Sequence, residues 1–431
     1  MNNATFDLDS VIGVDFGTSN SAASRLNPIS KAPEIITFIE NGLSLIPSLA
    51  YINDEGEIDV GLVPQLQLER LSRYDAATKQ KIIGHTLRHI KRIMRPDGEF
   101  FGHSHVDIIA AILTKIKQQS EASCRFSKPI DGIVLTHPVE FADWQVDMLR
   151  EAIKKAGFRR YKFMLEPEAA ALYAIKSGIL KESARGVLVY DFGGGTFDAA
   201  YMYIEPDGSL SRKVAAQGDS SCGGSDIDRL LYGDWDQFVK ENYHRPLSAD
   251  KRKMDLEFLQ ECEDQKKMLS KVQSLPCGGL LPPIDGNLIS ASRTITRQQL
   301  NTLMAPVIDK TIVKTKLIIN DVKAQGLPLD SIILIGGSSR IPMVTEKLKA
   351  IVGDGVEIRS TGLVDVAVAL GALYSLNVPI KNPTPDTPPV KESKPNPPKP
   401  TKHFCIYCGK DIWSNQKFCM YCGKQNYMYK A

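Results

Sequence analysis

Residues 189–198 read VYDFGGGTFD, and residues 11–20 read VIGVDFGTSN. Each stretch has a short apolar run, an acid, a glycine turn and then a second run of alternating residues. Glycines let backbone N–H groups converge on an anion, because no Cβ blocks the approach and a positive φ is easily reached. A third turn of this kind, at 336–339, follows the apolar residues SIILI. The first two stretches therefore place related strand–turn–strand units about half of the main domain apart.

The residues after the first two turns alternate, as in TFDAAYMY, so we expect each turn to join two strands. A Walker A loop or a dinucleotide-binding fingerprint instead runs from a strand into a helix. Asp15, Asp191 and Asp198 would stand at strand ends next to bound phosphates, as a magnesium site requires. An ordinary hairpin explains any single turn, but three similar turns, two of them flanked by acids, favour a phosphate site. The protein-kinase reading of DFG is disfavoured, because neither an HRD loop nor a VAIK strand is present.

Length and composition are those of a soluble globular protein. The chain has 431 residues, of which 43% are hydrophobic and 24% charged. Single cores stop growing at roughly 250–300 residues, so at least two lobes are expected. The polar start MNNATFDLDS argues against a secretory signal, and no apolar run approaches the ~20 residues needed to cross a bilayer. We expect a cytoplasmic protein that does not enter a membrane.

Charge is unevenly distributed along the chain. Residues 381–431 contain nine lysines and three acids, whereas the whole chain carries a formal charge of +3. Residues 1–380 therefore carry about −3, which is nearly balanced. This balance gives no indication that the main body binds nucleic acid.

Periodicity predicts mixed helices and strands. Residues 5–60 and 132–138 read as strands, and 331–344 reads as a strand, a glycine turn and a helix. Helical spacing occurs in the ranges 62–94, 106–122, 143–157, 166–178 and 364–376, and a long charged helical region is expected over 226–271.

The end of the chain has a different character. Residues 381–402 contain eight prolines in 22 positions, which excludes a helix or a central strand and predicts a semi-rigid tether. Beyond it, Cys405, Cys408, Cys419 and Cys422 follow the spacing C-x2-C-x10-C-x2-C. Four such thiolates predict a closed tetrahedral Zn²⁺ site that is structural, with disulfides or free thiols as alternatives. The other cysteines are scattered and fit reduced thiols in a cytosol.

The chain from residue 11 to about 378 resembles the nucleotide-binding domain of the 70-kDa heat-shock chaperone family (DnaK-type), within the actin and sugar-kinase superfamily. The resemblance rests on the two phosphate-loop stretches quoted above and on LIGGSSRIPMV, THPVEF, LEPEAAAL, GGSDID and CEDQKKMLS. It implies an α/β protein with a two-lobed actin-like ATPase fold, a duplicated core and ATP in the cleft. The expected domains are lobe I (1–185), lobe II (186–380), a Pro-rich linker (381–402) and a zinc ribbon (403–431).

The resemblance also implies roles for individual residues. Lys91, Glu166, Asp191 and Asp198 would be catalytic, and Asp15 with the last two would position Mg²⁺ largely through its waters. The loops that hold ATP or ADP phosphates would contain Gly17, Thr18, Ser19, Asn20, Gly193, Gly194, Gly195, Thr196, Gly223 and Gly224. The nucleoside would lie between Glu263, Lys266, Lys267 and Ser270 on one side and Gly336, Gly337, Ser338, Arg340 and Asp365 on the other.

Departures from the family pattern shape the functional expectation. In this sequence Ser19 replaces the usual threonine and Lys267 replaces an arginine. Val146 replaces an arginine that relays the state of the hinge proline, here Pro138. No β-sandwich substrate domain follows residue 378 in this sequence.

We therefore expect a slow, Mg²⁺-dependent ATPase switch, monomeric, that engages a protein partner through its zinc ribbon. A co-chaperone or exchange factor is one candidate partner, and nucleic acid is not favoured. The alternatives are an actin-like filament former, a non-hydrolysing ATP-binding scaffold and, less favoured, a small-molecule kinase.

Overall fold

The computed structural model describes residues 6–124, 126, 128–248, 254–282, 289–378, 380–381, 402–404 and 411–413. These residues form two compact units. Unit 1 lies within Met1–Gly224 and Asp309–Glu392, and the described residues of unit 2 lie mainly in Ser225–Ile308. Within these ranges no helix is long and apolar enough to cross a membrane.

The first sheet of unit 1 is built around the hairpin that starts at Val11. Across the sheet its strands are β11 (Arg160–Leu165), β10 (Gly132–His137), β1 (Val11–Asp15), β2 (Asn20–Leu26) and β3 (Pro33–Ile35), and β4 (Ile46–Pro47) pairs with β2. The strands β11, β10 and β1 are parallel, and β2 and β3 are antiparallel to their neighbours. The predicted strand–turn–strand unit at 11–20 is therefore confirmed.

The second sheet repeats this arrangement. Its order is β19 (Glu357–Ser360), β18 (Ser331–Ile335), β12 (Gly186–Phe192), β13 (Phe197–Ile204), β14 (Leu210–Ser211) and β20 (Ile380–Lys381), and β15 (Gln217–Asp219) pairs with β13. The parallel and antiparallel pairings match those of the first sheet strand for strand. The two similar stretches of sequence are thus equivalent hairpins of a duplicated α/β core.

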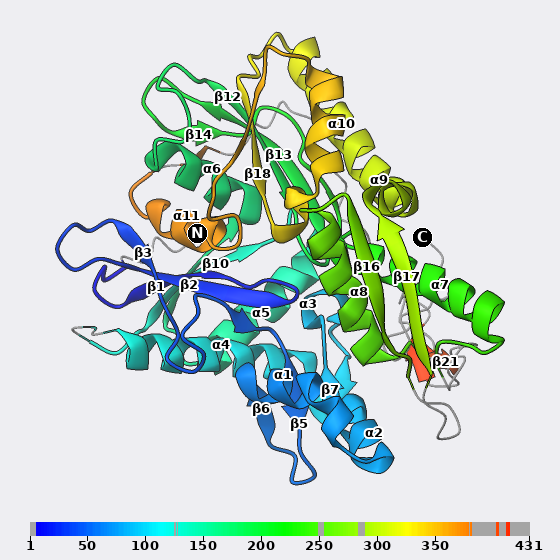
Figure 1. The fold of residues 1–431 in the computed structure, drawn as a ribbon. Helices are drawn as coiled ribbons and strands as arrows, with labels where there is room; N and C mark the ends of the chain where they lie inside the picture. The colour runs from blue at the N-terminus through cyan, green and yellow to red at the C-terminus, as the bar shows by residue number, and fades with distance from the viewer. Residues whose placement is uncertain are drawn as a thin grey trace. The chain divides into compact units, whose positions relative to one another are not determined.

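Two helices join the sheets into one core (Figure 1). α6 (Glu166–Lys176) packs on β12 and β13, and α11 (Ala367–Tyr374) packs on β1 and β2, so each sheet is covered by a helix from the other half of the sequence. One apolar cluster contains residues of both sheets and both helices, including Val134, Val189, Ala170 and Leu373. The helices touch because Gly371 has no side chain: a Cβ there would overlap the carbonyl of Ala169.

The remaining elements of unit 1 surround these sheets. The segment between β4 and β10 contains β5 (Ala50–Ile52), β6 (Ile58–Val60), α1 (Leu62–Glu69), η1 (Leu71–Arg73), α2 (Ala76–His85), β7 (Thr86–Leu87), α3 (Ile90–Ile93), β8 (Glu99–Phe100), β9 (His103–Ser104) and α4 (His105–Ser123). α5 (Asp143–Lys155) packs on α4, and η2 (Gly337–Arg340) with α10 (Pro342–Val352) follows β18. The helix expected over 143–157 stops as predicted, since Gly157 has φ of +78°.

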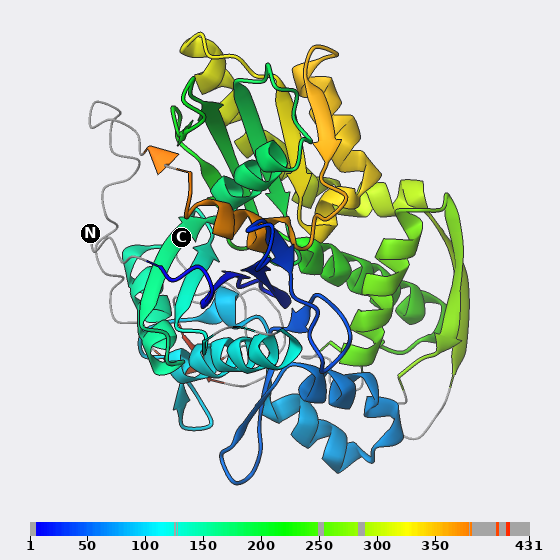
Figure 2. The ribbon, with the colours of Figure 1, turned by 90° about the vertical axis from the view of Figure 1, so that its left-hand side faces the viewer.

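Unit 2 contains α7 (Gly224–Tyr243), α8 (Leu256–Leu269) and the long antiparallel hairpin of β16 (Ser274–Leu280) and β17 (Ser290–Thr296), which Figure 2 shows clearly. α9 (Arg297–Ala324) begins in this unit, and its residues from Asp309 onward belong to unit 1. The single helical region expected over 226–271 was wrong. His244 has φ of +51°, a left-handed value, and Arg245 precedes a proline, so α7 cannot continue.

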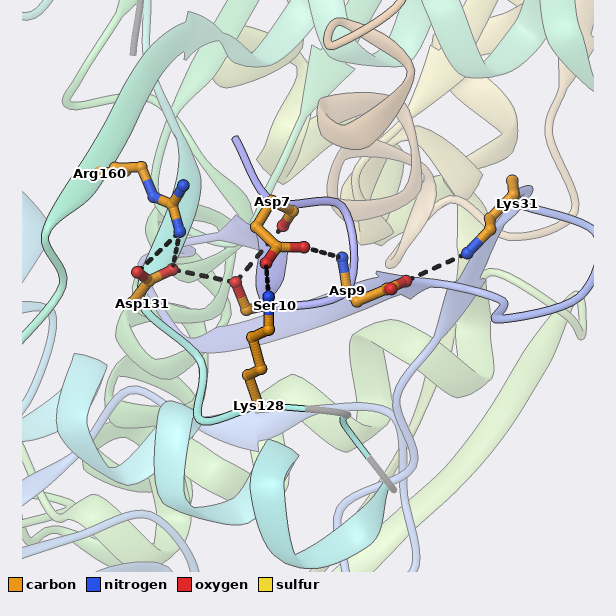
Figure 3. Close-up of polar contacts among 7 residues, drawn as sticks. All are labelled: Asp7, Asp9, Ser10, Lys31, Lys128, Asp131 and Arg160. Carbon is orange, nitrogen blue, oxygen red and sulfur yellow. Dashed lines mark hydrogen bonds and ion pairs between the residues drawn. The ribbon is translucent and has the colours of Figure 1, made fainter. Parts of the chain in front are cut away.

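A polar cluster fixes the N-terminal segment at the start of the first sheet (Figure 3). Arg160 Nη2 donates to both carboxylate oxygens of Asp131 at 2.7 Å, and Ser10 Oγ donates to Asp131 at 3.0 Å. Lys128 pairs with Asp7 at 2.8 Å. These bonds connect the starts of β1, β10 and β11, at the sheet edge opposite to the strand ends that hold the predicted acids.

After β20 the structure describes two short strands. β21 (Lys402–Phe404) and β22 (Asp411–Trp413) are antiparallel, with Lys402 opposite Trp413 and Phe404 opposite Asp411. Cys405, Cys408, Cys419 and Cys422 lie outside the described residues.

Candidate active site

Four segments meet at the glycine turn between β12 and β13. The carbonyl oxygen of Gly193 accepts from the Gly224 N–H at 3.0 Å and from Ser338 Oγ at 2.8 Å. The N–H of Gly193 donates to Thr196 at 3.0 Å, which closes the turn. Three of the predicted glycine segments therefore share one carbonyl group.

The turn between β1 and β2 reaches the same place. A Cβ on Gly194 would lie 3.0 Å from Ser19 Oγ, and a Cβ on Gly195 would lie 2.9 Å from Thr18 Cβ. A Cβ on Gly223 would lie 2.5 Å from the backbone carbon of Gly195. Side chains at these glycines would fill the space between the two hairpins, so only backbone lines this space at these positions. Such a lining suits a chain of phosphates.

Three aspartates stand beside these turns, as predicted. Asp15 ends β1, and Asp191 lies opposite Asp198 in the β12–β13 register. Thr136 Oγ1 donates weakly to Asp15 at 3.5 Å, and the Val139 N–H donates to Asp198 at 2.9 Å. A Cβ on Gly336 would lie 2.6 Å from Asp191, so the third glycine turn also borders this carboxylate.

Lys91 and Glu166 form an ion pair among these acids. Lys91 lies on α3, and Glu166 is the first residue of α6, directly after β11. Their side chains are 2% and 6% exposed. Because a buried charge needs a counter-charge, each of these residues requires the other.

The titration of the group reflects an excess of negative charge. Burial first, and the charge of Glu166 second, raise the pKa of Asp15 to about 7. Burial and the charge of Glu166 likewise raise the pKa of Asp191 and of Asp198 well above the usual range. Burial alone would lower the pKa of Lys91, but the charges of Glu166 and Asp15 outweigh it, and the net direction is upward.

This excess suits a divalent cation. Four carboxylates face one ammonium group, so a bound cation would relieve their repulsion. Within the part of the chain that the structure describes, no three acids, histidines or cysteines are placed to ligate one ion together. A cation here would therefore be held through waters and phosphate oxygens, with Asp15, Asp191 and Asp198 as acceptors.

A duplicated core whose two glycine-turn hairpins meet is the arrangement that the sequence resemblance implied, whereas the ion pair of Lys91 and Glu166 was not predicted. A family model described as Hsp70 protein matches residues 11–384, which is most of the chain. The chain belongs to the Hsp70 family. Members of this family bind ATP with Mg²⁺ and are chaperone-like ATPases, so ATP binding and ATPase activity are the general properties that the match supports.

The residues that Hsp70 resemblance assigns to the nucleoside form two groups. In unit 1, Arg340 pairs with Asp365 at 2.9 Å, and a Cβ on Gly337 would lie 3.4 Å from Asp365. In unit 2, Glu263, Lys266 and Lys267 lie on α8, and Ser270 is its C-cap. Lys267 pairs with Glu263 at 2.9 Å.

The structure adds residues that sequence reasoning missed. Asp228, in α7, pairs with Lys266 at 2.6 Å, and both side chains are less than 10% exposed. Burial is the main cause that raises the pKa of Asp228 to about 6. Asp228 is the last residue of the quoted GGSDID motif, so its position was known from the sequence, but its ion-pair partner was not. Val139 was also missed, although its neighbour Pro138 was singled out as the hinge.

Proposed function

We propose that this Hsp70-family protein hydrolyses ATP slowly, with Mg²⁺, at the junction of the two hairpins. The observation that carries the proposal is the convergence of Thr18, Gly195 and Gly223 beside a group of charged side chains. Of these, Glu166, Asp198 and Lys91 are buried, and Asp15 and Asp191 are partly buried. Phosphoryl transfer needs positioned charge and a placed water, with little covalent chemistry. The proposed residues supply both.

Each residue has a distinct task in the proposed reaction. Backbone amides of 17–19 and 194–196 bind the phosphates, and Asp15, Asp191 and Asp198 hold the water shell of Mg²⁺, which neutralises phosphate charge when bound. Glu166 orients a water whose oxygen forms a bond to the γ-phosphorus. The bond to the β–γ bridging oxygen breaks, and its electron pair stays on ADP. The proton of the water leaves with phosphate or to solvent, and Lys91 stabilises the charge that develops.

Single-turnover hydrolysis of radiolabelled ATP tests this proposal. We expect phosphate release with Mg²⁺ and its loss in EDTA, and we expect Asp191→Asn to lower the rate about 10²-fold or more. Transfer of the label to a sugar or carboxylic acid instead of water would favour a small-molecule kinase. ATP-dependent pelleting would favour an actin-like filament, and tight ATP binding without phosphate release would favour a scaffold.

We further propose that the protein is a cytoplasmic, monomeric nucleotide switch whose partner binds a zinc ribbon at 403–431. In support, β21 and β22 flank Cys405 and Cys408 in sequence, as the two strands of a ribbon hairpin would. The proposed boundary between lobe I and lobe II, at residues 185 and 186, falls after the last strand of the first sheet and before the first strand of the second.

A separate expectation concerns peptide binding. With Val146 in the relay position, ATP should change the affinity of the protein for extended hydrophobic peptides by less than tenfold, measured by fluorescence anisotropy.

Partner capture tests the switch. We expect a protein, such as a co-chaperone or exchange factor, to bind differently to the ATP-loaded and nucleotide-free forms. Binding should be lost when Cys405 and Cys408 are both replaced by serine. If a partner bound the ATP-loaded and nucleotide-free forms equally, in wild type and in the variant without Cys405 and Cys408, this would contradict both the switch and the role of the ribbon.

A further inference from the structure

Two cations stand next to each other on α3 and point to different places. Lys91 pairs with Glu166. The stem of Arg92 instead reaches the turn between β12 and β13, since a Cβ on Gly195 would lie 3.0 Å from Arg92 Cδ. Successive residues of a helix are about 100° apart around its axis, which accounts for the divergence.

The contact of Arg92 lies where the two hairpins meet. The position that a Cβ of Gly195 would occupy also borders Thr18, at 2.9 Å from its Cβ. Thr18 and Gly195 are the residues whose amides are proposed to bind phosphate. The guanidinium group is one bond beyond Cδ, so it stands within reach of the same phosphates.

The backbone around Arg92 is held in a defined position. His89, the N-cap of α3, has φ of +58°, a left-handed value that is uncommon for residues other than glycine. The Arg92 N–H donates to the His89 carbonyl at 2.8 Å, and the Met94 N–H donates to Ile90 at 2.8 Å. A strained residue kept in place by its surroundings is typical of functional segments.

We propose that Arg92 is a second phosphate-binding cation, which contacts the terminal phosphoryl group of ATP. This inference rests on the proposed function and adds a residue to it. The transferred phosphoryl group gains charge on its three outer oxygens, so more than one cation can stabilise it. Lys91, which also pairs with Glu166, would be the first of these cations. A guanidinium is always charged and donates two parallel hydrogen bonds to phosphate, which a lysine cannot do.

The test compares ATP with ADP, because only ATP carries the group that Arg92 is proposed to bind. Arg92→Met keeps the stem that packs at Gly195 and removes the charge. We expect it to weaken ATP binding at least tenfold more than ADP binding, and to slow single-turnover hydrolysis about 10²-fold. Arg92→Lys should have affinities and a hydrolysis rate between those of wild type and Arg92→Met, since it restores the positive charge but not the two parallel hydrogen bonds.

Arg73→Met, which removes an exposed arginine at the end of η1, is the control and should leave both affinities unchanged. Thermal unfolding of each variant confirms that it is folded. An ATP-to-ADP affinity ratio within threefold of wild type in Arg92→Met would overturn the inference. Wild-type protein that binds ATP without hydrolysing it would overturn only the proposed hydrolysis, because the ratio still tests Arg92. Wild-type protein that binds neither nucleotide would overturn both.

Discussion

At the scale of single residues, the ion pair of Lys91 and Glu166 makes a direct prediction about chemistry. Lys91→Ala should leave ATP binding nearly intact but slow single-turnover hydrolysis by about 10²–10³-fold, because the lysine acts mainly on charge that develops during transfer. Lys81→Ala is a matched control, since Lys81, on α2, forms an exposed ion pair with Asp54. Hydrolysis at the wild-type rate in Lys91→Ala would exclude the proposed role.

A second residue, His105, predicts how stability depends on pH. The imidazole is 1% exposed at the start of α4, where its Nδ1 accepts from the Arg95 N–H at 3.3 Å. Burial first, and the charge of Arg95 second, lower the pKa of His105 from 6.5 to about 4. Between these values the unfolded chain binds a proton that the folded protein does not. The free energy of unfolding that His105 contributes is therefore complete above pH 6.5 and lost as the pH falls through 4.

Comparing the pH dependence of unfolding of wild type with that of His105→Asn isolates this effect. His105→Asn retains an acceptor near the Arg95 N–H but does not titrate. From pH 7 to pH 4, wild type should lose up to about 3 kcal/mol more of its free energy of unfolding than the variant. Denaturant unfolding at several pH values measures this, and parallel losses in the two proteins would contradict the prediction.

The residues that could be predicted are those whose position depends on their own segment. Asp15, Asp191 and the glycines lie in hairpins that short stretches of sequence specify, so their grouping was expected. The roles of Lys91 and Glu166 came from the family resemblance alone. Arg92 and Asp228 could not be assigned, because each depends on a residue that is distant in the chain. Arg92 lies beside Gly195, and Asp228 pairs with Lys266.

At the scale of elements, the close approach of α6 and α11 predicts the effect of a single methyl group. Gly371→Ala would place a Cβ inside the van der Waals radius of the Ala169 carbonyl oxygen, so the two helices must separate. We expect the free energy of unfolding to fall by about 1–3 kcal/mol. Thermal or denaturant unfolding measures it.

The matched control is Gly84→Ala, in the helix α2. Nothing lies within 4 Å of a Cβ at this position, so the change should stabilise the protein by about 0.5–1 kcal/mol through helix propensity. Equal effects of the two substitutions would mean that the α6–α11 contact does not constrain the fold.

Elements differ in how well sequence predicts them, for physical reasons. Strands β1, β12 and β18 carry continuous apolar runs that end in turns, and these were located correctly. The break after α7 depends on the left-handed backbone of His244 and on Pro246 two residues later, which helical periodicity does not detect. The β16–β17 hairpin was not predicted, since its strand SLPCGGL contains proline and two glycines, and it is stabilised by pairing along its whole length with β17.

At the scale of the whole molecule, the Pro-rich segment decides whether the two ends of the chain act separately. We expect this segment to be an extended, solvated tether, as its composition predicts. Few contacts can cross such a tether, so events in the cysteine module should not reach the nucleotide site. The ATPase residues that the structure describes end with β20, where Ile380 and Lys381 pair with β14. A shortened chain should therefore retain Lys381 to keep this edge of the second sheet intact.

The final prediction concerns the metal and both parts of the chain. The purified protein should contain one Zn²⁺, and replacing Cys405 and Cys408 by serine should remove it. Structural zinc in such peptides contributes about 10–16 kcal/mol, so a chelator should unfold only the residues near 403–425. Hydrogen exchange locates the unfolding, while calorimetry compares ATP affinity with and without chelator and in the chain ending at Lys381. If the predicted tether isolates the module, all three affinities should agree within about threefold. A large loss of ATP affinity in either altered protein would mean that the module docks on the ATPase body and regulates it directly.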